Sequence, residues 1–534
     1  MFTRLGRLIV RRRPLILALT VLFALGAGVV GSRVFPHLSE GGFDDPGSES
    51  SQARQFLEEE LGAGDPDVVL VVDALGGDVD DPAVATAAGE LTAELDGQDH
   101  VARVASYWSL GQAPPLRDRT GDSALVVVDL DGSETEIDEA TGAIEDTYGG
   151  ARGPIAVGIG GRAAVAGAIR DQVKSDLAKA EAVAAPATLV LLVLVFGGLV
   201  AASLPLAVAL LSVIGTLLAL FSLAQVTDVS IFAINLTTAL GLGLAIDYSL
   251  FMVSRFREEL CAGLSSDAAV VRTVETAGRT VGFSALIVAA SLSALLVFPL
   301  YFLRSFAYAG VAVVLMAAVG SLLTLPALLA AVGPRINAWP LRRRPTRAAA
   351  VEDGFWHRLA SAVMRRPVPI ATGVVGVLVV VGIPFLDVNP GLPSYTVLPA
   401  SDEARQVSER LAGEFDGNQG EQFAIVLPGV DAGGADAAAV GSFVADVGAV
   451  EGVAQVDVRS ATAGSWVTVV PDVPLRSPKG EALVRDLRAI DAPFEFGVEG
   501  AAAELVDSKA AIYDRLPLAI GIVGLVTFVL LFAV

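Results

Sequence analysis

The chain has 534 residues, of which 53% are hydrophobic and 18% are charged, and its formal net charge is −22. A soluble protein of this length would carry more charge and fewer apolar runs, so the composition indicates a polytopic membrane protein. One cysteine and three scattered histidines exclude a disulfide framework and a zinc site, and no P-loop occurs, so we expect neither a metal nor a cofactor.

The N-terminal residues 1–13 are basic, and an apolar run follows at 14–30. This pattern also suggests a signal peptide. The run is long, however, and a similar arginine-proline junction recurs at Arg366, far from the N-terminus. We therefore interpret 14–30 as a first membrane-spanning helix and 1–13 as its cytoplasmic flank, because positive flanks stay inside.

Residues 31–182 are polar, and their periodicity predicts the element order βαββαβ, which is the ferredoxin-like arrangement. Strands are expected at 68–72, 101–108, 125–130 and 155–159, and helices at 82–95 and 134–148.

The next part of the chain, 183–332, predicts a bundle of five membrane spans. These spans are expected at about 183–200, 206–223, 231–253, 281–299 and 306–332. The predicted outer loops contain only Arg304 as a basic residue, whereas arginines gather at 254–280 and in a cytoplasmic linker at 333–366. This asymmetry follows the positive-inside rule. The alternating charges at 254–260 suggest a short interfacial helix.

A seventh span is expected at 367–386, and a second polar segment at 387–514 again predicts βαββαβ. An eighth span is expected at 515–534. In the second polar segment, strands are expected at 423–427, 453–458, 466–470 and 494–498, and helices at 435–449 and 479–490.

The two halves are similar in sequence. The stretch at 50–62 resembles 401–413, and the arginine-proline junctions after Arg13 and Arg366 recur at nearly the same offset. Repeated halves are common in transporters. A second half as complete as the first would need four more spans, so we expect a C-terminally truncated piece of a twelve-span protein. A natural eight-span variant is the alternative.

Four stretches are typical of one family: GGFDDPGSESSQAR at 41–54, GLGLAIDYSLFMVSRFREEL at 241–260, TAGRTVGFSA at 276–285 and FWHRLASAVMRRP at 355–367. The chain resembles, over its whole length, the mycobacterial membrane protein large (MmpL) transporters of the resistance-nodulation-division (RND) superfamily. The resemblance implies a polytopic α-helical protein with two porter-type extracytoplasmic α+β domains. It also implies export of lipids or other hydrophobic molecules, driven by the proton-motive force. By position, it implies that Asp247 and Tyr248 form half of a proton relay.

Asp247 lies in the span expected at 231–253, roughly 9 Å from its inner end at the rise of an α-helix. An acid at that depth must be paired, hydrated or protonated, and intramembrane acids usually have a function. A structural acid bonded to a neighbouring hydroxyl is the alternative to a proton carrier. Tyr248 is either a hydrogen-bond donor to a carboxylate or a packing aromatic, and both remain open.

Small residues precede this pair. Gly241, Gly243 and Ala245, together with Ala239, give small residues four positions apart twice, a spacing that lets a partner helix approach closely and predicts helix packing at the relay. Ser284 and Ser291 lie two turns apart in the fifth span and are candidates for relay support. Such serines more often bond their own helix backbone.

The leading hypothesis is a proton-driven exporter of lipid or hydrophobic small molecules in the plasma membrane, with membrane lipids, a homo-oligomer or envelope proteins as partners. The alternative is a sterol-sensor-like or envelope scaffold that binds lipid without transport. We expect no enzyme, because neither a nucleophile elbow nor paired acids occur in the polar segments. We expect no nucleic-acid partner, because membrane spans flank the cluster Arg342–Arg344.

Overall fold

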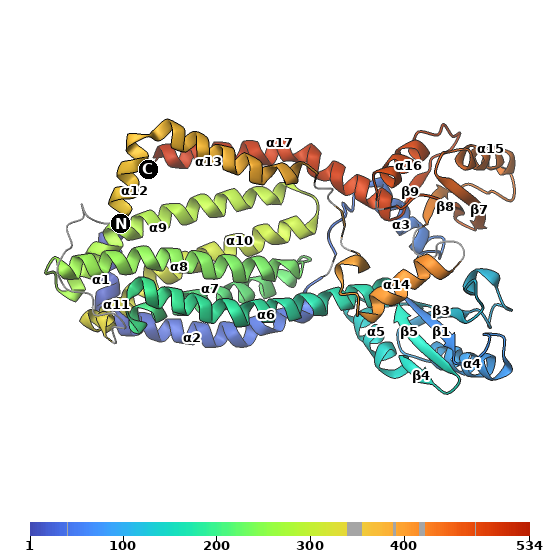
Figure 1. The fold of residues 1–534 in the computed structure, drawn as a ribbon, viewed down its shortest axis with the longest axis horizontal. Coiled ribbons are helices and arrows are strands. Elements are labelled where there is room, and N and C mark those ends of the chain that lie inside the picture. Colours follow the sequence, from blue (N-terminus) through green and yellow to red (C-terminus); the bar gives the residue numbers. More distant parts are fainter. Residues whose placement is uncertain are drawn as a thin grey trace.

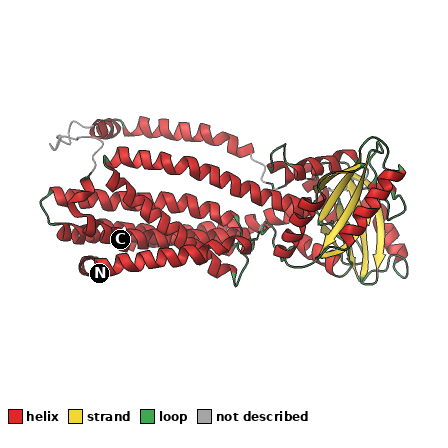
Figure 2. Ribbon diagram, turned by 90° about the horizontal axis from the view of Figure 1, so that it is seen from below, coloured by secondary structure: helices red, strands yellow, loops and turns green. Residues whose placement is uncertain are grey.

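The computed structural model is elongated, with a bundle of long helices at one end and two small sheet-containing units at the other (Figure 1). Seen from below, the strands are confined to one end of the molecule (Figure 2). Both chain ends lie at the end of the bundle that is farthest from the sheets (Figure 1). The structure describes residues 1–39, 41–338, 355–387, 391–392, 394–415, 422–475 and 477–533. The cluster Arg342–Arg344 therefore lies outside the described residues.

Eight helical segments in the described part of the chain are long and apolar enough to cross a membrane. This number equals the number of spans expected from the sequence. Two amphipathic helices, α1 (Phe2–Arg11) and α12 (Phe355–Arg365), precede the first and the seventh of them. The eight are α2 (Arg13–Gly31), α6 (Arg162–Phe196), α7 (Leu199–Ala224), α8 (Phe232–Cys261), α9 (Ser266–Ser293), α10 (Tyr301–Val319) with α11 (Leu325–Val332), α13 (Pro367–Gly382) and α17 (Ala501–Ala533).

The first sheet has the strand order β2-β3-β1-β5-β4, and all its pairs are antiparallel. Without the edge strand β4, this is the order of a ferredoxin-like sheet. The sequence did not predict β4, which is only three residues long. The elements are β1 (Val68–Ala74), α4 (Pro82–Asp96), β2 (Val101–Ser106), β3 (Ser123–Leu130), α5 (Glu134–Tyr148), β4 (Gly150–Arg152) and β5 (Ile155–Gly160).

The second sheet repeats this topology, with the order β7-β8-β6-β9 and antiparallel pairs throughout. Its elements are β6 (Phe423–Pro428), α15 (Ala437–Gly448), β7 (Val453–Ala461), β8 (Gly464–Pro471), α16 (Pro478–Arg488) and β9 (Gly497–Glu499). The internal repeat that the sequence suggested is therefore a repeat of structure as well.

One face of each sheet is covered by a helix from the other half of the chain, and both covering helices lie between the two sheet units (Figure 1). Helix α14 (Glu403–Glu414) lies on the first sheet, and α3 (Glu49–Glu59) lies on the second. These two helices contain the stretches that are similar in sequence. The apolar contacts join Val407, Leu411 and Phe415 to Val69, Val71 and Leu125 on the first sheet, and Ala53, Leu57 and Leu61 to Ala424 and Val426 on the second.

Two long helices, α6 and α17, run without a break from a sheet unit into the bundle. Each starts after a glycine in the left-handed region, Gly161 (φ 97°) or Gly500 (φ 131°). A Cβ at Gly161 would lie 2.7 Å from the carbonyl oxygen of Asp67, and one at Gly500 would lie 2.9 Å from that of Gln422. Only glycine therefore permits the tight passage from strand to helix.

The glycines of the GGF stretch at 41–43 let the chain that leads from the bundle to α3 lie directly against the start of α10. The Gly42 carbonyl accepts a hydrogen bond from the Phe302 N–H at 3.1 Å. A Cβ at Gly42 would lie 2.5 Å from the ring of Tyr301, so the backbone can lie there only without a side chain. Phe43 then packs against the rings of Phe232, the first residue of α8, and Phe302, the second residue of α10.

Candidate functional site

Asp247 lies near the middle of α8, a helix of 30 residues, about 22 Å from its first residue. Its side chain is exposed in this chain, whereas the adjacent Tyr248 is only 4% exposed. Consecutive residues of an α-helix point about 100° apart. The two predicted relay residues therefore face different surroundings: Asp247 lies on an open face, and Tyr248 points into the bundle.

Asp247 belongs to a continuous exposed face of α8, which we call the Asp247 strip. Its members are spaced by four residues, so they lie along one line of the helix surface. A Cβ at Gly243 would meet no atom within 4 Å, so the strip is open at its centre. A small residue one turn before the acid leaves room for another helix or for a ligand to approach the carboxylate closely. The strip consists of Asn235, Ala239, Gly243, Asp247 and Phe251.

The predicted small-residue set is divided between two faces. Gly241 and Ala245 are buried, and a Cβ at Gly241 would lie 3.0 Å from Val313 of α10 and 3.1 Å from Val213 of α7. These two residues therefore allow close packing inside the bundle. Gly243 lies on the strip instead, one turn before Asp247.

The hydroxyl of Tyr248 faces Ser284 of α9. No hydrogen bond of standard geometry links this hydroxyl to a described residue. Ser291 is half-buried two turns further along α9, and within the described part of the chain no hydrogen bond joins it to Asp247 or Tyr248. The structure thus places one of the two predicted serines beside Tyr248 and neither in a bond to Asp247.

Two further buried hydroxyls were not predicted from the sequence. Ser249 and Ser321 are fully buried, and neither hydroxyl has a hydrogen-bond partner among the described residues. An unpartnered buried hydroxyl costs about 1–3 kcal/mol, so such groups are worth explaining. Ser321 lies in a π-helical turn, Gly320–Thr324, a feature that is frequent at functional sites. The sequence could have indicated Ser249, because this residue directly follows the Asp-Tyr pair. No sequence pattern indicates Ser321, because the π-helical turn has no recognisable sequence signal.

The charged stretch after the strip is the end of α8 rather than a separate interfacial helix. Arg257 donates a hydrogen bond of 2.8 Å to the carbonyl of Phe196, and its guanidinium lies 5.8 Å from that ring. It thereby fixes the end of α6 to α8. Arg255 forms ion pairs with Glu258 at 2.9 Å and with Glu259 at 2.5 Å.

A second polar cluster lies between the two sheet units. Arg54 of α3 forms ion pairs with Asp44 at 2.7 Å and with Glu504 of α17. Burial, together with the charges of Asp65 and Glu504, raises the pKa of Glu499 to about 8. This cluster joins the two halves of the chain through charges that depend on pH.

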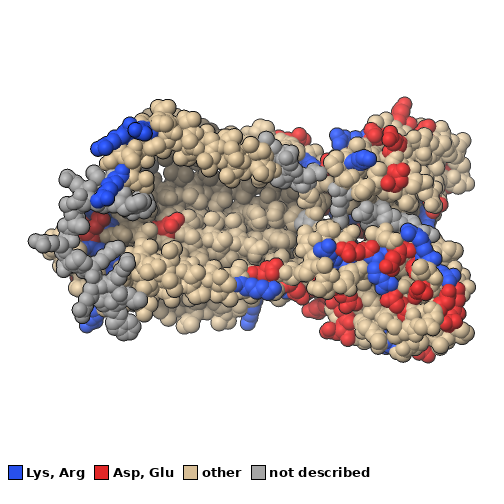
Figure 3. Space-filling model, in the orientation of Figure 1, with Lys and Arg blue, Asp and Glu red and all other residues tan. Residues whose placement is uncertain are grey.

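The surface of the bundle suits a lipid environment. In Figure 3 the long helices are almost entirely uncharged, and the basic and acidic side chains gather at the end of the bundle that is remote from the sheets and on the sheet units. The same view shows a hollow beside α13, whose described residues are exposed almost throughout. In the described part of the chain, no group of three or more His, Cys, Asp or Glu residues could hold a metal ion.

Comparison with known proteins gives a consistent family. The sequence model of the MMPL family matches residues 42–370. Putative membrane protein SCO6666 of Streptomyces coelicolor is 37% identical over 545 residues, which cover 100% of this chain and 73% of that protein. The trehalose monomycolate exporter MmpL3 of Mycolicibacterium smegmatis is 32% identical over 585 residues, which cover 100% of this chain and 57% of MmpL3. The heme uptake protein MmpL11 of Mycobacterium tuberculosis is 32% identical over 398 residues, which cover 71% of this chain and 40% of MmpL11. The chain thus spans little more than half the length of MmpL3.

Proposed function

This chain belongs to the MMPL family, and on that premise we propose that it serves proton-driven export of lipids or other amphiphilic molecules across the cytoplasmic membrane. The MmpL3 relatives, which match the whole chain, are named trehalose monomycolate exporters, and this supports a lipid cargo. The MmpL11 relative is named for heme uptake and matches 71% of the chain. A hydrophobic cargo is common to both names, and export has the support of the longer match.

The observation that carries the proposal is the position of Asp247, midway along an apolar helix and on the exposed Asp247 strip, one turn after Gly243. A carboxylate in the membrane is stable only when it is paired, hydrated or protonated. A change between these states alters what the strip can contact, so proton binding would favour one arrangement of the helices over another. Protons that enter from one side and leave to the other would then drive a cycle.

The long helices supply a path from this strip to the sheet units, which we propose to be extracytoplasmic and to form the route or gate for the cargo. Because α6 and α17 are unbroken, a tilt of either helix in the bundle moves the sheet that it enters. Arg515 of α17 donates a hydrogen bond of 3.0 Å to the carbonyl of Val297, next to the end of α9. Motion of α9 relative to α8 would thus reach the second sheet unit.

The test is Asp247→Asn in the intact protein, reconstituted into vesicles that hold a fluorescent lipid substrate and a pH gradient. We expect gradient-driven transport to fall at least about tenfold, because the amide cannot exchange the proton. The thermal unfolding temperature should hardly change, because Asp247 is exposed. Asp228→Asn is the matched control, since Asp228 is also an exposed acid of the bundle and lies in the turn before α8.

Transport by Asp247→Asn at the rate of the control would rule out the relay. Wild-type protein that binds the lipid but shows no flux with or without the gradient would favour the scaffold instead.

A further inference from the structure

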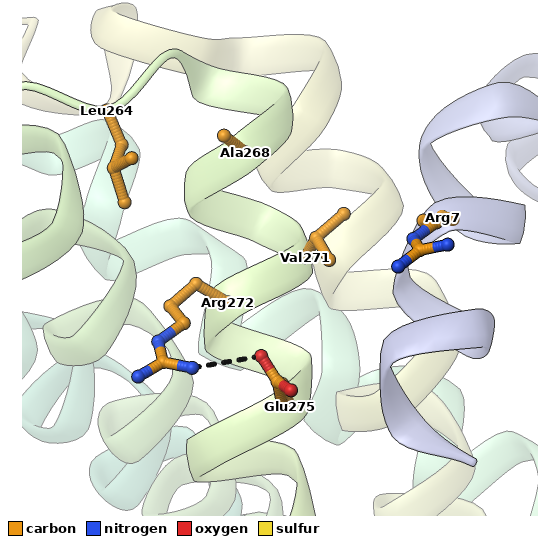
Figure 4. Close-up of a pocket in the computed structure, with 6 residues that line it drawn as sticks. All are labelled: Arg7, Leu264, Ala268, Val271, Arg272 and Glu275. Carbon is orange, nitrogen blue, oxygen red and sulfur yellow. Dashed lines mark hydrogen bonds and ion pairs between the residues drawn. The ribbon is translucent and has the colours of Figure 1, made fainter.

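A shallow pocket of about 430 Å³ lies between α1 and the first turns of α9 (Figure 4). It is at the end of the bundle that is remote from the sheets, where the chain also begins (Figure 1). Its walls combine charged and apolar side chains from the two helices and from the turn before α9. The lining residues are Arg7, Leu264, Ala268, Val271, Arg272 and Glu275.

Close packing of α1 against α9 builds the pocket. Gly6 is buried, and a Cβ there would lie 3.0 Å from the Cα of Val271, so glycine lets the two helices approach. Ile9 is fully buried one turn further along. Thr3 donates a hydrogen bond of 3.0 Å to the carboxylate of Glu275. These contacts fix the rotation of α1 and hold Arg7 at the rim.

The charges of the pocket are unbalanced. Arg272 forms an ion pair with Glu275 at 3.0 Å, and Arg7 forms no ion pair or hydrogen bond with any residue that the structure describes. Figure 4 shows the two guanidinium groups on either side of Glu275. Two cations and one anion leave an excess positive charge. A negative group between the arginines would be attracted by both.

The rest of the pocket is apolar. Leu264 is 39% exposed although it is a large hydrophobic residue, and Ala268 and Val271 continue the same surface. The pocket lies on the charged first half of α9, which precedes the apolar second half of this helix. Excess positive charge beside an exposed apolar surface at a membrane boundary fits a molecule with an anionic head and a hydrocarbon tail.

We propose that this pocket binds the headgroup of an anionic phospholipid from the leaflet at the sheet-distal end of the bundle. Arg7 and Arg272 contact the phosphate, for which the planar guanidinium is well suited. Leu264 and Val271 contact the first methylene groups of the acyl chains. Glu275 competes with the phosphate for Arg272, so the bound lipid replaces the ion pair between these two residues.

The experiment measures lipid retained by the intact protein. The protein is purified in detergent, titrated with phosphatidylglycerol, and its bound lipids are counted by native mass spectrometry. Arg7→Gln and Arg272→Gln should each weaken the tightest phosphatidylglycerol site about tenfold, because each removes a charged hydrogen-bond donor. Arg11→Gln is the control, since it removes the same charge from an exposed site on the same helix, outside the pocket.

A variant with the opposite expected effect excludes a mere loss of folding. Glu275→Gln frees Arg272 from its ion pair and should strengthen phosphatidylglycerol binding several-fold, while an amide can still accept from Thr3. Equal retention by Arg7→Gln, Arg272→Gln and Arg11→Gln would overturn the proposal, and so would weaker retention by Glu275→Gln. Full displacement of the lipid by millimolar inorganic phosphate would also overturn it, because it would identify a site for a soluble anion.

Discussion

The carboxylate of Glu49, the first residue of α3, accepts a hydrogen bond of 2.9 Å from the backbone N–H of Val498, although the two residues are 449 positions apart. The second half of the chain repeats this relationship. Glu403, the first residue of α14, accepts a hydrogen bond of 3.1 Å from the N–H of Ile159. Each acid anchors a helix of one half on a strand of the other half. The two sheet units therefore complete each other, and neither is an independent domain with its own full set of elements.

A disulfide between α3 and β9 tests directly whether the helix of the first half lies on the sheet of the second half. An ideal Cβ at Gly497 lies 3.1 Å from the Cβ of Ala53, slightly below the separation of about 3.5–4.5 Å found in disulfides. We expect Ala53→Cys with Gly497→Cys, in a Cys261→Ser background, to oxidise to an intramolecular disulfide that changes mobility on a non-reducing gel.

The control for this pair replaces Gly497→Cys with Gly441→Cys, because a Cβ at Gly441 of α15 has no neighbour within 4 Å. Free thiols in the Ala53–Gly497 pair under conditions that oxidise a reference disulfide would contradict the exchanged arrangement.

The cluster between the sheets predicts a pH-dependent stability. Burial and the neighbouring acids Asp65 and Glu504 raise the pKa of Glu499 from 4.5 to about 8. Between these two values the folded state binds more protons than the unfolded state, so the free energy of unfolding falls as the pH rises from about 4.5 to 8. Glu499→Gln should remove this part of the pH dependence and stabilise the protein at pH 8. Denaturant unfolding, followed by tryptophan fluorescence to which Trp466 in β8 contributes, measures the slope.

Glu495→Gln serves as the comparison, because Glu495 is an exposed acid that lies four residues away on the surface. If the two variants changed the pH slope equally, Glu499 would not be the group responsible.

Removal of the buried Tyr248 hydroxyl should lower transport without lowering the free energy of unfolding. Because this hydroxyl has no hydrogen-bond partner among the described residues, Tyr248→Phe should leave the free energy of unfolding unchanged or raise it by about 1 kcal/mol. Transport should nevertheless fall if the hydroxyl takes part in proton movement beside Ser284. Thermal unfolding and vesicle transport on the same preparation give both quantities.

Tyr107→Phe provides the contrast, since the Tyr107 hydroxyl donates to Asp80 at 3.0 Å and its loss should cost about 1 kcal/mol. A strong loss of stability in Tyr248→Phe would show that its hydroxyl is bonded after all.

The prediction of individual elements succeeded where the signal is local. Helix α5 begins at Glu134 and ends at Tyr148, as expected, and its N-terminus is fixed by a capping box between Ser133 and Glu136. Helices α6 and α17 begin before the expected spans, at Arg162 and Ala501, and the sequence did not predict these first turns because they are polar and resemble the preceding segment. The short strand β4 was missed, since three residues carry no periodicity.

The sequence by itself determined the class of protein, the eight apolar helices, the repeated βαββαβ order and the presence of Asp247 within one of those helices. These features depend on composition and on periodicity, both of which are determined by residues that are close together in the sequence. Only the tertiary structure decided that Asp247 lies on an open strip while Tyr248 is buried, that Gly241 and Gly243 lie on different faces, and that the two sheets exchange α3 and α14. A hydrophobic pattern indicates that a face is buried, but which distant segment covers it is settled by packing between the segments.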